Sequence, residues 1–338
     1  MSGTSFDGVD VALIKTDGYD YAKELHHAFL KYTKEEKKLY HYYLFDNLKK
    51  IKQIIDRKHL LCITKLFRES KFNTNNIDVI GVHGQTFGHN PLEQWTWQYI
   101  NVNKIVKKFN TKVVSDLRLK DLNFGGEGAP LAPIYHHLLC KSVEEKFPIV
   151  VLNIGGIANA TIINNNKILK GFDVGPGNGP LDTLVLKKLN INMDDGGKLA
   201  SKGKPNENIA NKIIHNLKNN FKNNSFDRAK VDDVCVELLK NMNLNNSLAT
   251  ITLVICKMMF FKINHFKPCT IILVGGGRKN KFLVKKIKDT FNCPVKLSEE
   301  VGWNGDALEA QAFAYLAVRS LLGLNITYKE TTGVVRSM

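Results

Sequence analysis

Short apolar runs that end in a cluster of glycines recur along this chain and constrain its fold more than any other feature. These runs alternate with longer stretches of helical periodicity, a pattern typical of an α/β protein rather than of one with separate α and β halves. In open α/β sheets, ligands bind at the carboxyl ends of strands, and most of the clusters directly follow a predicted strand. The clusters span residues 3–8, 81–88, 125–128, 155–156, 171–179, 196–203 and 275–277.

The predicted elements keep this alternation over the whole chain. Strands are predicted over residues 9–15, 78–82, 112–115, 149–153, 160–163, 270–274 and 294–297. Helices are predicted over residues 34–56, 133–139, 180–189, 206–218, 231–242, 248–262, 280–290 and 306–322. A chain of 338 residues exceeds what one compact core usually holds, so we expect two domains.

The net charge of +16 raises the alternative of nucleic-acid binding. The lysines, however, are spread from Lys15 to Lys329 and mostly alternate with Asn, Asp or Glu, without the aromatic and glycine pattern of an RNA-binding sheet. A compositional bias toward Lys and Asn explains the charge more simply. We therefore expect no nucleic-acid partner and only weak, salt-dependent retention on DNA.

The six cysteines lie far apart, without a CxxC pair and without histidines at metal-ligand spacing. We interpret them as small buried side chains in a reduced compartment, and we predict no metal site built from them. The sequence shows no run of roughly eighteen apolar residues that could span a bilayer, and no start that resembles a signal peptide. We expect a soluble, cytoplasmic protein without a membrane partner.

The first glycine cluster, in "MSGTSFDGVDVALIKT", combines glycine and hydroxyl residues directly before an alternating strand. Backbone amides and the hydroxyls of Thr4 and Ser5 can donate to phosphate oxygens, and Asp7 or Asp10 can hold the water shell of a metal ion. An ordinary hairpin turn with polar residues is the alternative. The candidate cofactor-binding residues here are Gly3, Thr4, Ser5, Asp7, Gly8, Val9 and Asp10.

Two further glycine clusters support the same hypothesis. In "VVLNIGGIANATII", Gly155 and Gly156 join two apolar strands in a tight turn, which is also a common hairpin device. In "CTIILVGGGRKNKFLVKKI", Gly275, Gly276 and Gly277 lie between a buried strand and a helix, where they favour a nucleotide site over simple packing of sheet on helix. The chain lacks both the P-loop pattern and the GxGxxG pattern of a dinucleotide fold, so these two nucleotide sites are excluded.

The predicted last long helix, in "GDALEAQAFAYLAVRSLLG", is rich in alanine. Small side chains permit close packing, as in a hinge helix between two domains, although a plain core helix is the alternative. Glu309 either favours the helix dipole or faces a polar ligand. The alanines are Ala307, Ala310, Ala312, Ala314 and Ala317.

Two strand–turn–strand units with glycine tips, about 150 residues apart, resemble the two phosphate loops of the actin, heat-shock ATPase and sugar-kinase superfamily, and Gly275–Gly277 resemble its adenosine motif. The resemblance becomes specific through eight strings in order: "MSGTSFDGVD", "GVHGQT", "SDLRLKDLNFGGEGAPLAP", "LNIGGIANAT", "GFDVGPGNGPLD", "DGGKLASKGK", "LVGGGRKN" and "GDALEAQAFAYLA". Together they are similar to the motif series of the anhydro-N-acetylmuramic acid kinase family, nearly from end to end.

The resemblance implies an α/β, two-domain actin-like ATPase fold of ribonuclease H-like domains, with ATP and a sugar in the cleft between them. We expect the N-terminal actin-like domain over residues 1–130 with 308–338, and the C-terminal one over residues 131–307. ATP and Mg²⁺ are the implied cofactors. The implied small-molecule substrate is 1,6-anhydro-N-acetylmuramic acid, in cell-wall recycling, and a homodimer is compatible with the resemblance.

In the implied reaction, water opens the anhydro ring and the released O6 takes the γ-phosphoryl group of ATP, giving N-acetylmuramic acid 6-phosphate. Asp182, in "GFDVGPGNGPLD", matches the family's catalytic base; from the residues alone, a carboxylate at a helix N-terminus is the alternative. Arg118 is the candidate for the lactyl carboxylate, since a guanidinium fork fits a carboxylate. The other candidate substrate-binding residues are Glu309, His83 and Gln85, although a lone His is more often structural.

Three departures from the family pattern carry expectations. The family has a short apolar strand before the "MSGTS" loop, so we expect either a start upstream of Met1 or a sheet that lacks this strand and binds ATP more weakly. Glu127 replaces the usual Gln in "GGEGAPL" and adds a possible negative charge near the sugar site. Val174 replaces the usual Thr in "FDVGPGN" and deletes a hydroxyl. The last two bear on the catalytic rate.

Two other functions stay open at this point. A kinase for another amino sugar would use similar phosphate loops without coupled ring opening. A nucleotide-gated binding protein of the actin or heat-shock type would hydrolyse ATP to change the conformation of a partner. No separate peptide-binding domain follows the ATPase core in this sequence, and "GFDVGPGNGPLD" has a small-molecule explanation.

Overall fold

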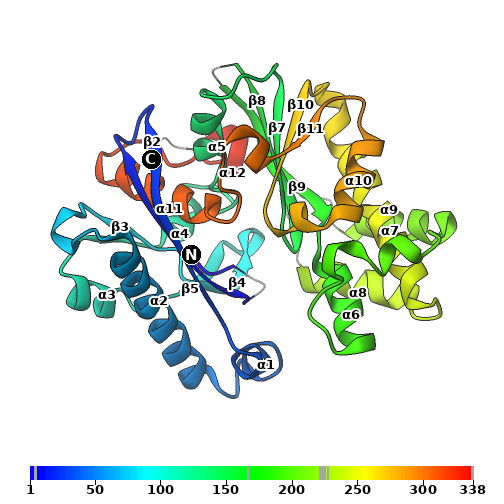
Figure 1. Ribbon diagram of the computed structural model, residues 1–338, viewed down its shortest axis with the longest axis horizontal. Coiled ribbons are helices and arrows are strands. Elements are labelled where there is room, and N and C mark those ends of the chain that lie inside the picture. Colours follow the sequence, from blue (N-terminus) through cyan, green and yellow to red (C-terminus); the bar gives the residue numbers. More distant parts are fainter. Residues whose placement is uncertain (4–5, 166, 221–225, 227, 336–338) are drawn as a thin grey trace. The chain divides into compact units, whose positions relative to one another are not determined.

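The structure is a computed structural model that describes residues 1–338 except 4–5, 166, 221–225, 227 and 336–338 (Figure 1). The chain divides into two compact units, one of Met1–Leu139 with Asp306–Met338 and the other of Cys140–Gly305. Helices and strands alternate in both units, which confirms the α/β class. All six cysteines are free thiols, and four of them are buried, as expected.

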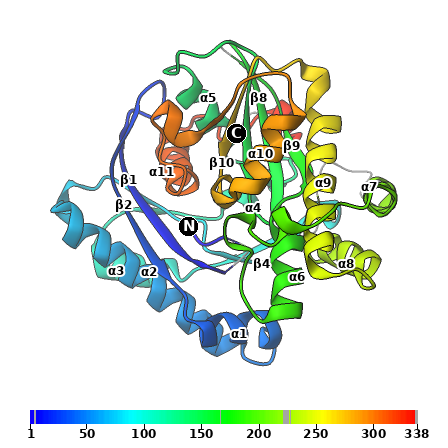
Figure 2. The ribbon, with the colours of Figure 1, turned by 45° about the vertical axis from the view of Figure 1, so that its right-hand side comes forward.

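The first unit is built around a long antiparallel hairpin of β1 (Gly8–Thr16) and β2 (Ala22–Lys31). Helix α2 (Leu48–Ser70) covers one face of this hairpin and α11 (Leu308–Leu321) the other (Figure 2). Period-two alternation in β1 turns Val9 and Leu13 toward the core. The buried side chains that join the hairpin to α2 are Phe6, Val9, Leu13, Ala28, Tyr32, Ile51, Ile55, Cys62 and Leu66.

The helix predicted over residues 34–56 is wrong as a single element. Helix α1 (Lys34–Tyr43) begins at a capping box formed by Thr33 and Glu36, and α2 starts again after Asn47. The break lies in the sequence "LFDN", where Asp and Asn favour turns over continued helix. Helical periodicity continues on both sides of the break, so the sequence pattern alone did not reveal it.

Residues at the very start of the described chain connect two hairpins of the first unit. Ser2 pairs with Val9 of β1 on one side and with Gln85 of β4 (Gln85–Asn90) on the other, and β4 pairs with β5 (Trp95–Tyr99). The main chain of Met1 exchanges two hydrogen bonds with Asp10, at 2.8 and 2.9 Å. Residues 1–2 thus supply a short strand-like pairing between β1 and β4, and the two expectations about a strand before the loop stay predictions.

The remaining small elements of the first unit were only partly foreseen. Strands β3 (Ile80–Gly81) and β6 (Val113–Val114) pair in parallel, inside the predicted ranges 78–82 and 112–115. Two 3₁₀ segments, η1 (Thr74–Asn76) and η2 (Pro91–Glu93), also belong to this unit. The elements that the sequence missed here are β2, β4, β5, α3 (Val102–Phe109), α4 (Leu117–Asn123) and α12 (Lys329–Thr332).

The second unit contains a five-stranded sheet in the order β11-β10-β7-β8-β9. Strands β7 (Ile149–Ile154), β10 (Thr270–Val274) and β11 (Val295–Leu297) run parallel, while β8 (Ile157–Asn164) and β9 (Lys167–Pro176) form an antiparallel meander with β7. The four strands predicted in this region are confirmed. Strand β9 was missed because Lys and Gly interrupt its apolar residues.

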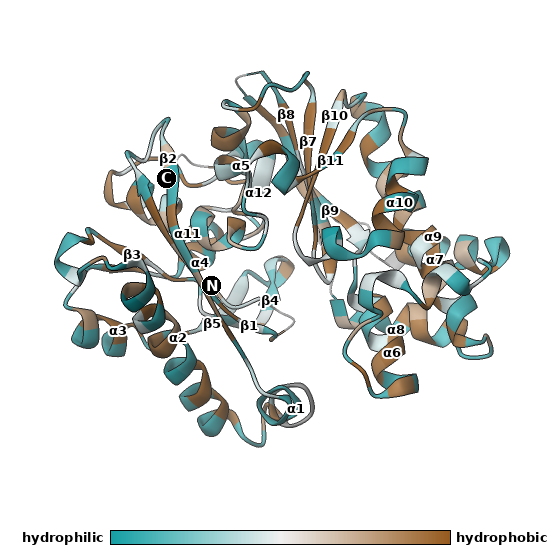
Figure 3. Cartoon of the chain, viewed as in Figure 1, coloured by the Kyte–Doolittle hydropathy of each residue, from teal (hydrophilic) through white to brown (hydrophobic). Residues whose placement is uncertain are grey.

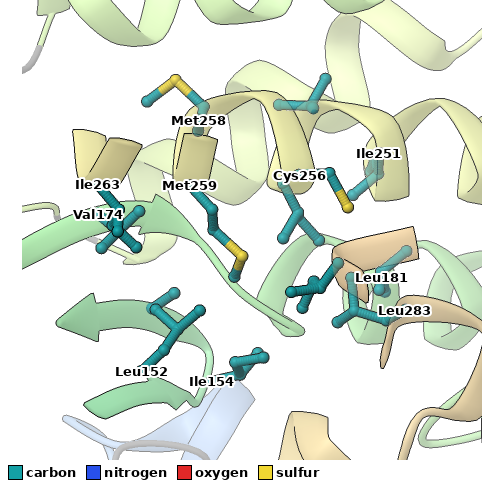
Figure 4. Packing of buried hydrophobic residues seen from close by; sticks show 14 of the residues in the cluster. Leu152, Ile154, Val174, Leu181, Ile251, Cys256, Met258, Met259, Ile263 and Leu283 are labelled. Atoms are coloured by element: carbon teal, nitrogen blue, oxygen red, sulfur yellow. The ribbon is translucent and has the colours of Figure 1, made fainter. Parts of the chain in front are cut away.

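Hydrophobic residues colour β7 and β10 in Figure 3, and helix α9 (Leu244–Ile263) packs its buried side chains over this sheet in Figure 4. The other helices of this unit are α6 (Gly179–Leu189), α7 (Glu207–Asn220), α8 (Arg228–Leu239) and α10 (Lys281–Thr290), and α5 (Pro133–Cys140) belongs to the first unit except for its last residue. Together with α9 and α11 they confirm the seven remaining predicted helices, with ends shifted by a few residues.

The segment Leu244–Phe266 is long and apolar enough to cross a bilayer, which corrects the statement that no such run exists. Its most apolar window is 67% buried within the structure, as expected for the core helix of a globular unit. Met259 and Ile263 of this helix point toward the strands in Figure 4. The apolar composition is thus explained by packing over β7 and its neighbours.

Truncating Leu152 tests this core. The side chain is fully buried in β7, so Leu152→Ala should lower the free energy of unfolding by about 2–5 kcal/mol through lost burial and the cavity left behind. Leu189→Ala, at a position 48% exposed at the end of α6, is the matched control and should change it by less than about 0.5 kcal/mol. Urea unfolding followed by circular dichroism measures both, and equal shifts would contradict the packing described.

Candidate active site

Glycine segments meet at the carboxyl ends of β7 and β10 in the second unit. Gly155 and Gly156 form the turn between β7 and β8, as predicted. The carbonyl oxygen of Gly155 accepts from Asn178 N at 2.7 Å, and that of Gly156 accepts from Gly177 N and Gly179 N at 3.0 Å each. A side chain on Gly177 would place its Cβ 2.3 Å from the Gly155 oxygen. The turn and the loop before α6 therefore form one tightly packed backbone assembly.

Asp182 lies in the first turn of α6, directly after this assembly. Its amide donates to the Asn178 carbonyl oxygen at 2.9 Å, and its side chain is half-buried. The N-terminal end of a helix carries a partial positive charge, which stabilises a nearby carboxylate. The position thus suits both the helix-capping alternative and a carboxylate held at the edge of a ligand site.

The third glycine segment packs on the same strand end. Gly275 has a φ of +77°, and a Cβ there would lie 2.2 Å from Asn153 Oδ1; a Cβ on Gly277 would lie 2.2 Å from Ile154 Cγ2. Gly276 faces open space. These glycines are thus needed for close packing at 275 and 277, and position 276 is the exposed one.

The three glycines lie between a buried strand and a helix, as predicted, but they do not adjoin the α-helix directly. A 3₁₀ segment, Gly276–Lys279, follows β10, and α10 begins only at Lys281. The Asn280 side chain caps that helix by accepting from Leu283 N at 3.1 Å. The first amides of α10 are therefore satisfied partly by the protein itself, and the helix end adds little to a ligand site at the glycines.

Arg278 fixes this loop, and sequence reasoning missed it. Its guanidinium is buried, donates to Glu299 Oε1 from Nε at 2.9 Å and from Nη2 at 2.7 Å, and reaches the Gly275 carbonyl oxygen from Nη1 at 2.8 Å. In the sequence it stands among lysines in "GRKNK", so nothing separates it from ordinary surface charge. Only the fold shows that it holds Gly275 in place.

The first unit carries the other predicted phosphate loop. Gly3 accepts from Phe6 N at 3.1 Å and from Gln85 Nε2 at 3.2 Å through its carbonyl oxygen. Phe6 is buried with a φ of +52°, and its ring stacks between those of Tyr32 and Tyr40 at centroid distances of 3.8 and 4.1 Å. Thr4 and Ser5, which the sequence proposed as hydroxyl donors, lie outside the described residues.

The residues that follow the loop divide into packing and polar positions. Gly8 and Val9 are buried, and a Cβ on Gly8 would lie 2.2 Å from the Phe29 ring, so both serve the core. The Asp10 carboxylate lies 3.1 Å from His27 Nε2. Asp7 alone is exposed, and it forms an ion pair with Lys37 of α1. Asp7 is therefore the best placed of the predicted carboxylates to meet a solvated ion.

Gln85 is fully buried and clamps the start of the chain. Its Oε1 accepts from Ser2 Oγ at 2.5 Å, and its Nε2 donates to Gly3 O at 3.2 Å and to Tyr40 Oη at 3.1 Å. Because these contacts use both ends of the amide, Gln85 is arranged to position the loop. The contacts describe this role directly, whereas its proposed contact with substrate stays a prediction.

His83 orients Arg118. Arg118 Nε donates to His83 Nε2 at 2.7 Å, and His83 Nδ1 lies 3.0 Å from the Gly84 carbonyl oxygen, which assigns the neutral tautomer with the proton on Nδ1. Burial, together with the Arg118 charge, lowers the pKa of His83 well below its usual range. Arg118 Nη1 also donates to Gly128 O at 3.1 Å. The guanidinium is thus fixed at two edges.

The loop 125–128 wraps around Asp121, a buried residue that sequence reasoning did not single out. The carboxylate accepts from Gly128 N at 2.7 Å and from the hydroxyls of Thr327 and Thr332 at 2.5 and 2.8 Å. Glu127 is half-buried in the same loop, and burial together with the Asp121 charge raises its pKa. The substitution of Glu for Gln thus places an acid where ionisation is disfavoured.

Two other predicted positions have different surroundings. Glu309 is exposed in the first turn of α11 and interacts electrostatically with the Met1 ammonium group. Burial lowers the pKa of that ammonium group, and the nearby Asp10, Cys62 and Glu309 partly offset the decrease. Val174 is buried among apolar side chains under α9, as Figure 4 shows. The lost hydroxyl at position 174 therefore bears on core packing rather than on an exposed polar contact.

The alanines of α11 serve packing inside the first unit. A Cβ on Gly81 of β3 would lie 2.4 Å from the Phe313 carbonyl oxygen and 2.8 Å from Ala317 Cβ. Ala307, Ala310 and Ala312 are also buried. This close approach supports the core-helix alternative, and the hinge role stays a prediction.

Comparison with known proteins matches the whole chain. The family model described as anhydro-N-acetylmuramic acid kinase matches residues 1–338. Three curated proteins named anhydro-N-acetylmuramic acid kinase are similar to it: 35% identity for that of Zymomonas mobilis, 36% for that of Paramagnetospirillum magneticum and 37% for that of Pelagibacter ubique. The alignments cover 100%, 98% and 99% of this chain and 96%, 95% and 94% of those proteins, respectively.

The histidines beside Arg118 predict an acid-sensitive fold. Burial, with Arg118, lowers the pKa of His89 to about 4 and that of His83 further below its usual range. The same groups titrate near 6.5 in the unfolded chain. As the pH falls from about 6.5 toward 4, the unfolded chain takes up protons that the folded protein does not, so the free energy of unfolding falls by up to ~1.4 kcal/mol per pH unit for each histidine.

Urea unfolding at pH 7, 6 and 5 measures this effect. His89→Gln should make the decline below pH 6.5 shallower by the share of one histidine, whereas His215→Gln, at an exposed position on α7, should leave it unchanged. A His89→Gln variant with the acid sensitivity of the parent protein would contradict the assignment of a neutral His89.

Proposed function

The chain belongs to the anhydro-N-acetylmuramic acid kinase family, and we propose that it opens 1,6-anhydro-N-acetylmuramic acid with water and transfers the γ-phosphoryl group of ATP to O6. The products are N-acetylmuramic acid 6-phosphate and ADP, which places the enzyme in peptidoglycan recycling. The observation that carries the proposal is the meeting of two glycine segments with the Asp182-bearing loop at one end of the β7–β10 sheet, in a chain matched over its full length.

Asp182 is the proposed general base. Its carboxylate would take a proton from the water that attacks the anomeric carbon, on the face opposite the bridging oxygen. The bond from the anomeric carbon to O6 breaks as the new bond to water forms, and O6 then displaces ADP from the γ-phosphorus. Support comes from its place in the first turn of α6, where the helix end favours the ionised carboxylate needed to accept that proton.

The glycine segments are the proposed phosphate and adenosine contacts. In phosphoryl transfer the protein mainly positions the groups and stabilises the charge on the phosphoryl oxygens. Gly155 and Gly156 use their carbonyl oxygens within the protein, and their amides make no hydrogen bond to any residue that the structure describes. They are thus suited to donate to phosphate, while the exposed Gly276 suits an adenosine contact.

Mg²⁺ is the proposed metal cofactor. No three His, Cys, Asp or Glu side chains gather as a metal cage among the described residues. A nucleotide-bound Mg²⁺ keeps several waters and needs only one or two carboxylates with the phosphates. The exposed Asp7 fits that requirement after release from Lys37. When bound, the ion would neutralise charge that develops on the phosphoryl oxygens.

For the sugar, we propose Arg118 as the partner of the lactyl carboxylate and Glu309 as an acceptor for sugar hydroxyls or amide. His83 and Gln85, considered as substrate contacts from the sequence, are better supported as positioning residues for Arg118 and the loop at Gly3. We further propose an actin-like fold for this chain, with two ribonuclease H-like domains, a cytoplasmic location and a homodimer. The order of the five-stranded sheet supports the fold assignment.

Reaction in ¹⁸O water tests the coupled mechanism. With the anhydro sugar, ATP and Mg²⁺, label should appear at the anomeric hydroxyl of the phosphorylated product. Asp182→Asn should lower both ring opening and phosphoryl transfer by at least ~10²-fold, because the base is lost. Asp195→Asn, at an exposed carboxylate in the same unit, is the control. ATP hydrolysis without sugar product, or activity confined to N-acetylglucosamine, would overturn the proposal.

Arg118→Lys tests the carboxylate contact. Lysine keeps the charge but cannot form the two-pronged contact, so the KM for the anhydro sugar should rise roughly 10- to 100-fold while the KM for ATP changes less than about twofold. Arg68→Lys, at an exposed position on α2, should change neither. Steady-state kinetics with each substrate varied gives both constants, and an unchanged sugar KM in Arg118→Lys would remove Arg118 from the substrate site.

A further inference from the structure

Arg228, the first residue of α8, lies flat against the β7–β8 turn. A Cβ built on Gly156 would lie 3.0, 3.1 and 3.2 Å from Cδ, Nε and Cζ of Arg228, and one on Gly179 would lie 3.2 Å from Nε. The guanidinium thus covers the glycine turn and the start of α6 together. Position 228 comes shortly after a lysine- and asparagine-rich segment, and no motif in the sequence singles it out.

The contacts of Arg228 leave most of its donors unused. Its one ion pair among the described residues is to Asp232, with Nε 3.6 Å from Oδ2, and the side chain is 26% exposed. The two terminal amino groups donate to no described residue. The amides of Gly155 and Gly156 likewise donate to no described residue. Arg228 and this turn together thus offer several hydrogen-bond donors to an anion.

Asp232 holds the other edge of this arginine. It is buried, accepts from Thr183 Oγ1 at 2.7 Å through Oδ2, and its Oδ1 is buried without a hydrogen-bond partner. Burial raises the pKa of Asp232, so its ionised form costs free energy that its contacts with Thr183 and Arg228 only partly offset. Oδ1 also lies 2.8 Å from the position of a Cβ on Gly179. A buried acid so incompletely satisfied stabilises the fold poorly, which favours a positioning role.

We propose that Arg228 binds a phosphoryl group of the nucleotide at the Gly155–Gly156 turn, and that Asp232, with Thr183, positions its guanidinium for that contact. This inference rests on the proposed function, because it takes the anion to be the phosphate chain of ATP. Arg228 stands in contact with the ligand, and Asp232 and Thr183 act through it. Its charge would add to that of the metal ion in stabilising the phosphoryl oxygens.

Kinetics and binding of Arg228→Gln test the proposal. Loss of a charge-assisted contact should lower kcat/KM for ATP roughly 10- to 100-fold and weaken ATP binding in calorimetry, while the inhibition constant of adenosine and the KM of the sugar change less than about twofold. Arg228→Lys, which keeps the charge, should recover part of the loss. Lys188→Gln removes a charge from an exposed position on α6 and should behave as the parent protein.

Asp232 is tested through the double variant. Asp232→Asn alone should show the same ATP-selective loss at a smaller size, and adding it to Arg228→Gln should cost less than twofold more, since both changes remove one contact. Independent, multiplying losses would exclude the positioning role. Equal loss of ATP and adenosine binding with a lowered melting temperature, or an unchanged kcat/KM for ATP, would overturn the role of Arg228.

The outcomes for the two proposals are separable. If Arg228→Gln does not fold, Arg228→Lys still tests the phosphate contact. A variant that loses ATP affinity but keeps adenosine affinity supports the contact. If Arg228 only formed a structural ion pair, the variant's affinities for ATP and adenosine would change in parallel. A parent protein that binds ATP but does not phosphorylate the anhydro sugar contradicts the proposed function alone, and calorimetry with ATP then still tests Arg228.

Discussion

Three main-chain hydrogen bonds hold the candidate active site of the second unit together. They run from the amides of residues 177–179 to the carbonyl oxygens of Gly155 and Gly156, at 2.7–3.0 Å. Buried backbone groups without hydrogen-bond partners cost free energy. These bonds satisfy the carbonyl oxygens of the turn, and its amide groups stay available to a ligand. It also places the start of α6, and so Asp182, at a fixed offset from the turn. Gly277 and Arg228 pack directly against this assembly, and Arg278 holds the neighbouring Gly275.

The first unit uses side chains where the second uses backbone. Gln85 bridges Ser2, Gly3 and Tyr40, and the Phe6 ring lies between two tyrosines, so the loop is anchored on both sides of the undescribed residues 4–5. His83 does the same for Arg118 by accepting from its Nε as a neutral ring. His83 and Gln85, both candidate substrate contacts from the sequence, thus hold other candidate residues in place in this structure.

Sequence patterns predicted the second unit better than the first, for physical reasons. Strands β7 and β10 are buried on both faces and read as continuous apolar runs, while β4 and β5 contain His, Gln, Trp and Gly and therefore show no continuous apolar run. The glycine clusters and Asp182 could be found from motifs. Asp121, Arg228, Asp232 and Arg278 could not, because a buried charge and a surface charge share the same letter, and only tertiary contacts separate them.

The tight backbone contact at Gly177 has an evolutionary consequence. A side chain there would meet the Gly155 carbonyl oxygen, a backbone atom that no substitution can remove. At Gly88, by contrast, an added Cβ would meet only the Trp95 ring, at 2.6 Å, and a smaller residue at position 95 would make room. We therefore expect Gly88 to tolerate replacement when position 95 is changed with it, whereas a replacement of Gly177 has no such compensating change.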